Sequence, residues 1–177
     1  QIVLAAQNCT PPLSKAEALR CFESAYSLYQ PNPKNPTDAG NALRLVKLFG
    51  SNIRYVYEFN SWIYWDGVRW LTDNDGHMYR LAKETARSTA QEAANENDES
   101  RRRSLMQHAL KSENKQQLDS MVQVAKTEEG VTISQVELDQ DKYLLGTPNG
   151  VVNLKTGGLI DNSKNSMITK QAGTAYD

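Results

Sequence analysis

The aromatic-rich stretch between residues 53 and 72 constrains the fold of this chain more than any other feature. It contains three runs of strand-forming residues, at 53–59, 62–65 and 68–71. The second break between these runs is Asp66-Gly67, and Asp-Gly between two such runs is a strong signal for a tight hairpin turn. The stretch therefore predicts a three-stranded antiparallel meander.

Three tryptophans stand in this meander, namely Trp62, Trp65 and Trp70. They could form either an aromatic wall around a ligand or the packed core of the hairpins. Large aromatic side chains are buried more often than they line a site. We therefore expect them to form hydrophobic core.

Apolar residues at helical spacing surround the meander. The predicted helices cover residues 14–29, 37–50, 77–94, 99–111 and 115–126, and short strands are predicted at 131–133, 143–145 and 151–154. This order predicts an α+β fold that is mainly helical, with an N-terminal antiparallel aromatic meander and short C-terminal strands.

The helix at 37–50 is expected to begin at a cap residue, Thr37 or Asp38, and to end at Gly50 in a left-handed conformation. Its predicted core face is Ala42, Leu45, Val46 and Phe49. Arg44 and Lys47 lie off that face on the helical wheel.

The helix at 77–94 predicts one buried and one basic side. The buried side is Met78, Leu81, Ala82, Thr85, Thr89 and Ala93. Arg80, Lys83 and Arg87 gather opposite. Clustered cations can contact DNA phosphates, although a solvated charged face is the usual explanation of such a pattern.

The chain divides into three parts. A leading helix is predicted within residues 1–30 and could be the tail of an upstream module. Residues 31–36 are expected to form a proline-rich linker, and residues 37–177 the main domain. Because the chain starts at Gln and stops abruptly, we expect it to be a fragment of a longer protein.

Composition narrows the functional classes. Lys and Arg number 20 against 21 Asp and Glu, so binding to nucleic acid must come from local clusters and not from net charge. No stretch approaches the roughly 20 apolar residues of a membrane helix. Two cysteines without a C-x-x-C pair favour a reducing compartment, and we expect a cytoplasmic protein.

The sequence contains no recognisable catalytic constellation. It lacks a P-loop, a nucleophile elbow, an H-E-x-x-H motif and a dinucleotide fingerprint, and its two histidines are far apart. No catalytic residue or metal ligand is therefore assigned. Asp139 and Asp141 leave one alternative open, since a D-x-D on a strand can hold metal ions for nucleotidyl transfer. A solvated turn is the favoured explanation, because the neighbours Gln140 and Lys142 are polar and do not form the buried apolar strand that a metal platform needs.

Three segments, taken together, resemble one family. Residues 37–45 read T-D-A-G-N-A-L-R-L, residues 62–70 read W-I-Y-W-D-G-V-R-W, and residues 144–159 read L-L-G-T-P-N-G-V-V-N-L-K-T-G-G-L. Their order and separation resemble the domain that precedes the superfamily-three helicase core in phage, plasmid and poxvirus primase-helicases. The residues that carry the resemblance are Asp38, Asn41, Trp62, Asp66, Gly67, Trp70, Asn149, Gly150, Thr156 and Gly157. Gly146 and Asn153 depart from the family pattern, which has Asn and Asp there.

The resemblance implies an accessory domain that links priming to ATP-driven DNA unwinding. ATP and Mg²⁺ would bind the parent helicase outside this segment, DNA would be a partner, and the parent would self-associate as a ring. As a DNA-binding module the domain would use Arg44, Lys47, Arg80, Lys83 and Arg87. As an oligomerisation collar it would use the aromatic hairpin without touching DNA. A metal-dependent nucleotidyl transferase is the third alternative.

Overall fold

The computed structural model describes residues 14–29 and 35–177, so the predicted linker lies largely outside the described residues. The helices within the described part are α2 (Lys15–Tyr29), α3 (Asp38–Phe49), α4 (His77–Ala94), α5 (Glu99–Ser112) and α6 (Lys115–Ala125). The strands there are β1 (Ile53–Val56), β2 (Ser61–Trp65), β3 (Trp70–Thr72), β4 (Thr132–Ile133), β5 (Leu144–Thr147), β6 (Gly150–Asn153) and β7 (Gly158–Ile160). Short 3-10 turns are η1 (Gly50–Asn52), η2 (Gln135–Glu137) and η3 (Lys164–Ser166). This arrangement confirms the α+β class.

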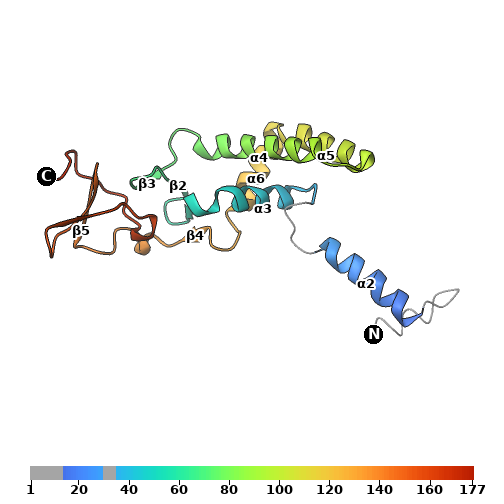
Figure 1. Cartoon of the computed structure of the whole chain (residues 1–177), viewed down its shortest axis with the longest axis horizontal. Helices are drawn as coiled ribbons and strands as arrows, with labels where there is room; N and C mark the ends of the chain where they lie inside the picture. The colour runs from blue at the N-terminus through green and yellow to red at the C-terminus, as the bar shows by residue number, and fades with distance from the viewer. Residues whose placement is uncertain (1–13, 30–34) are drawn as a thin grey trace.

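The helical layer is built from α3 to α6. Helix α4 packs along α5, and α3 packs against both α6 and α4 (Figure 1). The predicted buried side of α4 is confirmed at each of its six positions. In α6 the apolar residues spaced three and four apart in the sequence are likewise the buried ones, namely Leu118, Met121, Val122 and Ala125. No helix in the described part of the chain is both long and apolar enough to cross a membrane.

Helix α3 differs from its prediction in two respects. Arg44 is buried together with Ala42 and Leu45, because α3 is covered by α6 on one side and by α4 on another, which widens its buried arc. Gly50 is not left-handed but has a φ of −58°, and the chain continues directly into η1. A β-carbon on Gly50 would lie 2.9 Å from the Val46 side chain, so close packing explains this glycine better than a helix cap.

The predicted meander is confirmed as β1-β2-β3, and β4 joins it by pairing in parallel with β1. The resulting sheet, in the order β3-β2-β1-β4, is called sheet A. Strand β1 is shorter than predicted, because residues 57–60 form a turn in which Asn60 has a φ of 48°. A left-handed φ at residue 60 is incompatible with a continued strand.

Both faces of sheet A are covered. Ile53, Tyr55 and Trp62 pack into the helical layer. The opposite face carries a second small core of Val56, Ile63 and Trp70, against which the chain after β4 packs. The tryptophans are therefore core residues, as predicted, with Trp62 and Trp70 buried and Trp65 partly buried. Sheet A is the layer between the helices and the C-terminal part (Figure 1).

The C-terminal strands form a second antiparallel sheet, β5-β6-β7, called sheet B. The family-motif residues in this part hold turns and the end of the chain. Asn149 exchanges two hydrogen bonds with the backbone of Tyr176, and the Tyr176 hydroxyl donates to the Gly157 carbonyl. Thr156 accepts the Gly158 amide through its hydroxyl. The side chains of these residues therefore stabilise the turns of sheet B and its contact with the end of the chain.

The two departures from the family pattern have different structural consequences. Asn153 uses its side-chain oxygen to accept the Lys155 amide, which an aspartate would do equally well. Gly146 is buried beside the C-terminal segment, where a β-carbon would lie 2.6 Å from the Lys170 carbonyl oxygen. Of the two positions, only residue 146 requires a glycine, because a side chain there would collide with the neighbouring backbone.

Restoring the family residue at this position is expected to destabilise the protein. Gly146→Asn should lower the free energy of unfolding by about 1–3 kcal/mol, because backbone atoms must move to admit the side chain. Urea denaturation followed by circular dichroism measures the change. Gly173→Asn is the matched control, since nothing lies within 4 Å of a β-carbon built there. Equal stability of both variants would contradict the packing argument.

Candidate functional site

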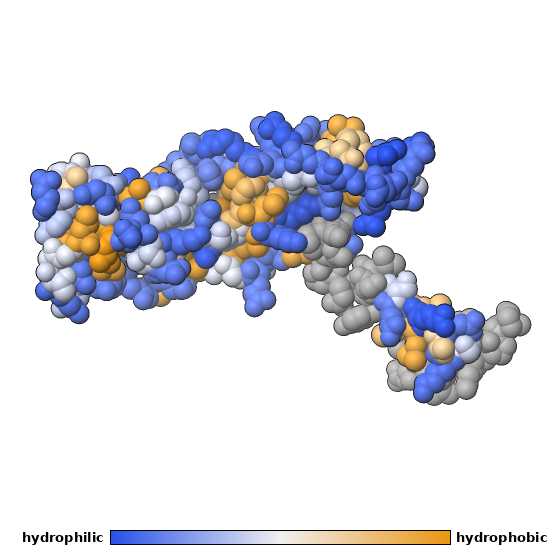
Figure 2. Space-filling view, viewed as in Figure 1, coloured by the Kyte–Doolittle hydropathy of each residue, from blue (hydrophilic) through white to orange (hydrophobic). Residues whose placement is uncertain are grey.

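Helix α4 presents Arg80, Lys83 and Arg87 on its exposed side, as predicted, and these three residues are called the basic face. Their exposure could be predicted from the local sequence, because burial of the apolar side of α4 fixes which residues face solvent. Two threonines on that buried side, Thr85 and Thr89, donate their hydroxyl protons to carbonyl oxygens one turn earlier. The surface over α4 and α5 is largely hydrophilic (Figure 2).

Asp73 fixes the start of α4. Its carboxylate accepts the amides of His77 and Met78, both at 2.8 Å, and also the amide of Asp75. Partial burial raises the pKa of Asp73, but these backbone donors outweigh burial and bring the pKa below its ordinary value. The ionised carboxylate thus replaces the missing intrahelical acceptors of the first turn.

The cations of the basic face have different partners. Arg80 forms an exposed ion pair with Asp75 at 2.8 Å, which is typically worth less than about 1 kcal/mol. Lys83 and Arg87 are exposed and make no ion pair with any residue in the described part of the chain. Of the ion pairs within residues 14–29 and 35–177, only the exposed Arg80–Asp75 pair would have to be broken for phosphates to bind these three side chains.

The other two residues predicted to contact DNA lie elsewhere. The Arg44 side chain is 7% exposed, and its Nη2 lies 2.9 Å from Glu92 Oε2 on α4. Lys47 is exposed on α3. The structure therefore does not bring Arg44 to the surface at which the basic face could meet DNA. The arginines that follow the acidic run 96–99 pair with it, Arg101 with Glu96 and Arg103 with Glu99.

The family-motif residue Asn41 links α3 to α5. Its side-chain nitrogen donates to Ser112 Oγ at 2.9 Å, and its oxygen lies 3.0 Å from His108 Nε2. Because an amide oxygen can only accept, His108 Nε2 carries a proton and cannot act as a base toward Ser112. Ser112 moreover donates to the backbone oxygen of His108. This arrangement stabilises helix packing and does not activate a nucleophile.

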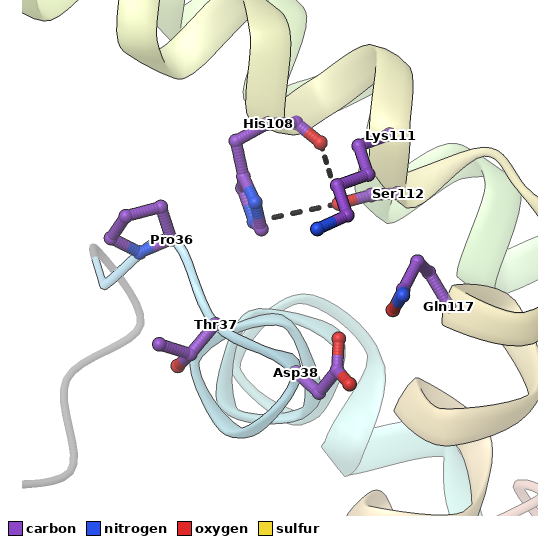
Figure 3. Close-up of a pocket in the computed structure, with 7 residues that line it drawn as sticks. All are labelled: Pro36, Thr37, Asp38, His108, Lys111, Ser112 and Gln117. Carbon is purple, nitrogen blue, oxygen red and sulfur yellow. Dashed lines mark hydrogen bonds between the residues drawn. The ribbon is translucent and has the colours of Figure 1, made fainter.

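A polar cavity of about 220 Å³ adjoins this cluster, between the start of α3 and the end of α5 (Figure 3). His108, Lys111 and Asp38 lie around it, and Ser112 is hydrogen-bonded to His108 within it. Burial lowers the pKa of His108, and the Arg44 and Lys111 cations lower it further against the opposing effect of Asp38. A neutral imidazole is thus favoured.

The D-x-D pair does not lie on a strand. Asp139 has a left-handed φ of 52°, and its carboxylate accepts the amide and the hydroxyl of Thr169. Asp141 accepts the amide of Tyr143. Asp139 therefore ties its segment to the chain around Thr169, and Asp141 organises a local turn. Nowhere in residues 14–29 and 35–177 do three or more His, Cys, Asp or Glu side chains gather so as to hold a metal ion.

The remaining motif residues of the hairpin also serve its geometry. Asp66 accepts the amides of Val68 and Arg69, and Gly67 has a φ of 103°, which a residue with a side chain rarely adopts. The hairpin buries Trp62 and Trp70, so neither ring offers a surface for a collar. Exposed apolar side chains instead occur on and near sheet B. Leu145 and Leu159 share one face of the sheet, Ile160 lies on the other, and Leu154 follows β6. Figure 2 shows an apolar area at this end of the molecule.

The prediction for one exposed aromatic residue, Phe59, is wrong. Phe59 is predicted within a strand but lies in the turn between β1 and β2, at the mouth of a cleft that Lys170 also lines. Asn60-Ser61 signals the break, but it does not show that the turn starts at residue 57. The two sides of the cleft come from segments more than sixty positions apart, and no local pattern reveals that they meet.

Comparison with known families gives one assignment. The sequence model of a family described as "D5 N terminal like" matches residues 42–177. No curated protein matches the chain. The matched segment runs from the interior of α3 to the end of the chain and thus includes both sheets and the basic face.

Proposed function

The chain belongs to the D5 N terminal like family, and from this membership we propose that it is the accessory domain of a DNA primase-helicase that contacts DNA through the basic face. Domains of this family are found in phage, plasmid and viral primase-helicase proteins. In such a parent the domain would couple priming to unwinding. ATP and Mg²⁺ would act at sites of the parent protein other than the turns and helices described above.

The exposure of the basic face carries this proposal. Arg80, Lys83 and Arg87 span about 10 Å along the α4 axis, which matches roughly three base-pair steps along one strand of a duplex. The opposite side of α4 is packed into the core. Because the helix is held by its buried side and by Asp73, the three cations are presented by a rigid element. Rigid presentation lowers the ordering cost of binding.

The test is the salt dependence of duplex DNA binding, compared between the wild-type chain and an Arg80→Ala, Lys83→Ala, Arg87→Ala variant. Each lost phosphate contact reduces the slope of log K against log salt by about 0.9. The triple variant is therefore expected to lose about 2.7 units of slope if all three side chains contact phosphates. Fluorescence anisotropy of a labelled duplex measures both the affinity and the slope.

A charge-matched control separates this contact from general electrostatics. Arg20, Arg102 and Lys115 are exposed and lie on three different helices. Replacing all three with alanine removes the same net charge but should leave most of the slope. Equal slopes in the two triple variants would overturn the assignment to the basic face, and so would the absence of DNA binding by the wild-type chain at low salt.

Self-association is the rival role, and the exposed apolar side chains on sheet B favour it. Sedimentation of the same samples tests it directly. A wild-type chain that assembles without binding DNA would support the collar in place of the DNA contact. Leu159→Lys should then return the protein to monomers, because a charged side chain cannot be buried unpaired in an apolar interface.

A further inference from the structure

A cleft of about 370 Å³ opens on the face of sheet A that points away from the helices. This volume falls within the range of small-molecule sites, roughly 300–1,000 Å³. Phe59, Ile63 and Trp70 contribute its apolar wall, while the polar groups on the other side come from Gln135, Asp139, Thr169 and Lys170. The cleft therefore combines a hydrophobic wall with hydrogen-bonding groups and a partly exposed Lys–Asp ion pair.

The apolar wall is fixed in position. Trp70 is 1% exposed, and its indole nitrogen donates to the Lys164 carbonyl at 2.8 Å. The Arg54 guanidinium lies 5.3 Å from the Trp70 ring centre, on which it stacks. Ile63 is likewise buried. A ligand entering the cleft would meet a floor that does not need to reorganise.

Phe59 stands at the mouth of the cleft with 46% of its surface exposed. The residues on either side of it are both anchored. Glu58 accepts hydrogen bonds from the Ser134 hydroxyl and the Gln135 amide, at 2.7 and 3.2 Å. Asn60 is left-handed and accepts the Tyr55 hydroxyl at 2.6 Å. The fold thus holds in place a turn whose central residue is an exposed aromatic ring.

Pre-organisation of an exposed ring suits a planar partner. A base stacked on an aromatic side chain gains about 1–3 kcal/mol, and every base offers a suitable face. Only an unpaired base exposes that face, because the bases of a duplex stack on one another. Lys170 lies at the rim with 87% of its side chain exposed, and its Nζ is 3.8 Å from Asp139 Oδ2. A nucleotide phosphate at this position would compete with that long, partly exposed ion pair for the lysine, at a cost of less than about 1 kcal/mol.

The cleft is also connected to the basic face along the chain. Thr72 lines the cleft at the end of β3, and Arg80 begins the basic face eight residues later. The turn between them is tied to α4 by Asp73. The cleft and the basic face are therefore linked by a short, ordered segment of chain.

We propose that this cleft binds an unpaired base of single-stranded DNA, with the base stacked on Phe59 and the adjoining phosphate near Lys170. The proposal rests on the proposed function, since it assigns a strand preference to the same DNA-binding domain. The cleft would bind only single-stranded DNA, because it needs an unpaired base. The basic face would bind phosphates of single-stranded and duplex DNA alike.

The test compares Phe59→Ala with Tyr57→Ala in the full chain. Tyr57 is more exposed than Phe59 and belongs to the same turn, but it does not line the cleft. Affinity for labelled oligothymidylate should fall roughly 5- to 150-fold in Phe59→Ala, the equivalent of one stacked base. Affinity for a duplex of the same length should not change, and Tyr57→Ala should resemble the wild type with both ligands. Phe59→Tyr should retain binding, since the ring is kept.

A Lys170→Ala variant tests the phosphate separately, because it should lower the salt slope for single strands by about 0.7 while leaving the stacking intact. Equal affinities of Phe59→Ala and Tyr57→Ala for oligothymidylate would overturn the base site, and so would an equal loss on duplex DNA.

Failure of the base site is distinguishable from failure of the basic face. If the triple variant of the basic face loses duplex binding while Phe59→Ala behaves as wild type, the proposed function stands and only the cleft is wrong. Thermal unfolding of each variant confirms that it is folded.

Discussion

Replacing Arg44 with alanine is expected to lower the free energy of unfolding by about 2–3 kcal/mol, although the sequence places this residue among surface cations. Breaking a buried ion pair commonly costs about 3–5 kcal/mol, and partial exposure of Glu92 reduces that figure here. The change also removes an aliphatic stem packed between α3 and α4. Urea denaturation measures the loss.

Two controls identify its cause. Lys47→Ala removes an exposed cation from the same helix and should change stability by no more than about 0.5 kcal/mol. Arg44→Met should recover much of the loss relative to alanine, because it keeps the packed stem. Both variants remove the buried Arg44 Nη1, which has no hydrogen-bond partner within the described structure. Equal losses in Arg44→Ala and Lys47→Ala would show that the ion pair contributes nothing.

A double-mutant cycle with Glu92→Gln measures the pair itself. If the Nη2–Oε2 contact is the main interaction, the two single changes should be clearly non-additive. Arg44 would then be a residue that joins α3 to α4, and its place in the family motif would be explained by packing. This reading is consistent with Asn41, one turn earlier, which joins α3 to α5.

Periodicity predicted those parts of the fold that depend on local sequence. The buried sides of α4 and α6 follow from residues spaced three and four apart, and the basic face follows as the complement of the buried side of α4. The turn at Asp66-Gly67 was predictable because glycine tolerates a positive φ. Each of these features is decided within about twenty residues of sequence.

Long-range contacts decided the rest. Pairing of β4 with β1 joins positions 132–133 to 55–56, and no period in either segment predicts which strand the partner is. The same holds for Arg44, which is buried because α4 crosses α3 and not because of its own neighbours. The cleft around Phe59 combines both effects, since its walls come from the hairpin and from the chain after β4.

Replacing Trp70 with alanine is expected to produce the largest loss of stability, about 3–5 kcal/mol, as for other fully buried large aromatic residues. The indole packs between Trp65 and Arg54, and its nitrogen donates to the Lys164 carbonyl. Alanine would keep the hydrogen bond from the residue 70 backbone amide to the Ile168 carbonyl, so the loss comes from the side chain alone. Trp70→Phe keeps most of the ring and should lose about 1–2 kcal/mol.

The position of Trp70 predicts where the structure should open first. Because its contacts connect sheet A with the segment around η3, their loss should uncouple sheet B before the helical layer unfolds. Hydrogen exchange in Trp70→Ala should therefore lose protection in β5 to β7 more than in α4. Met121→Ala is the control, since Met121 is equally buried but lies in the helical core. It should lower protection in α4 at least as much as in sheet B. The same pattern of exchange in both variants would show that the two layers unfold together and that Trp70 is only one core residue among many.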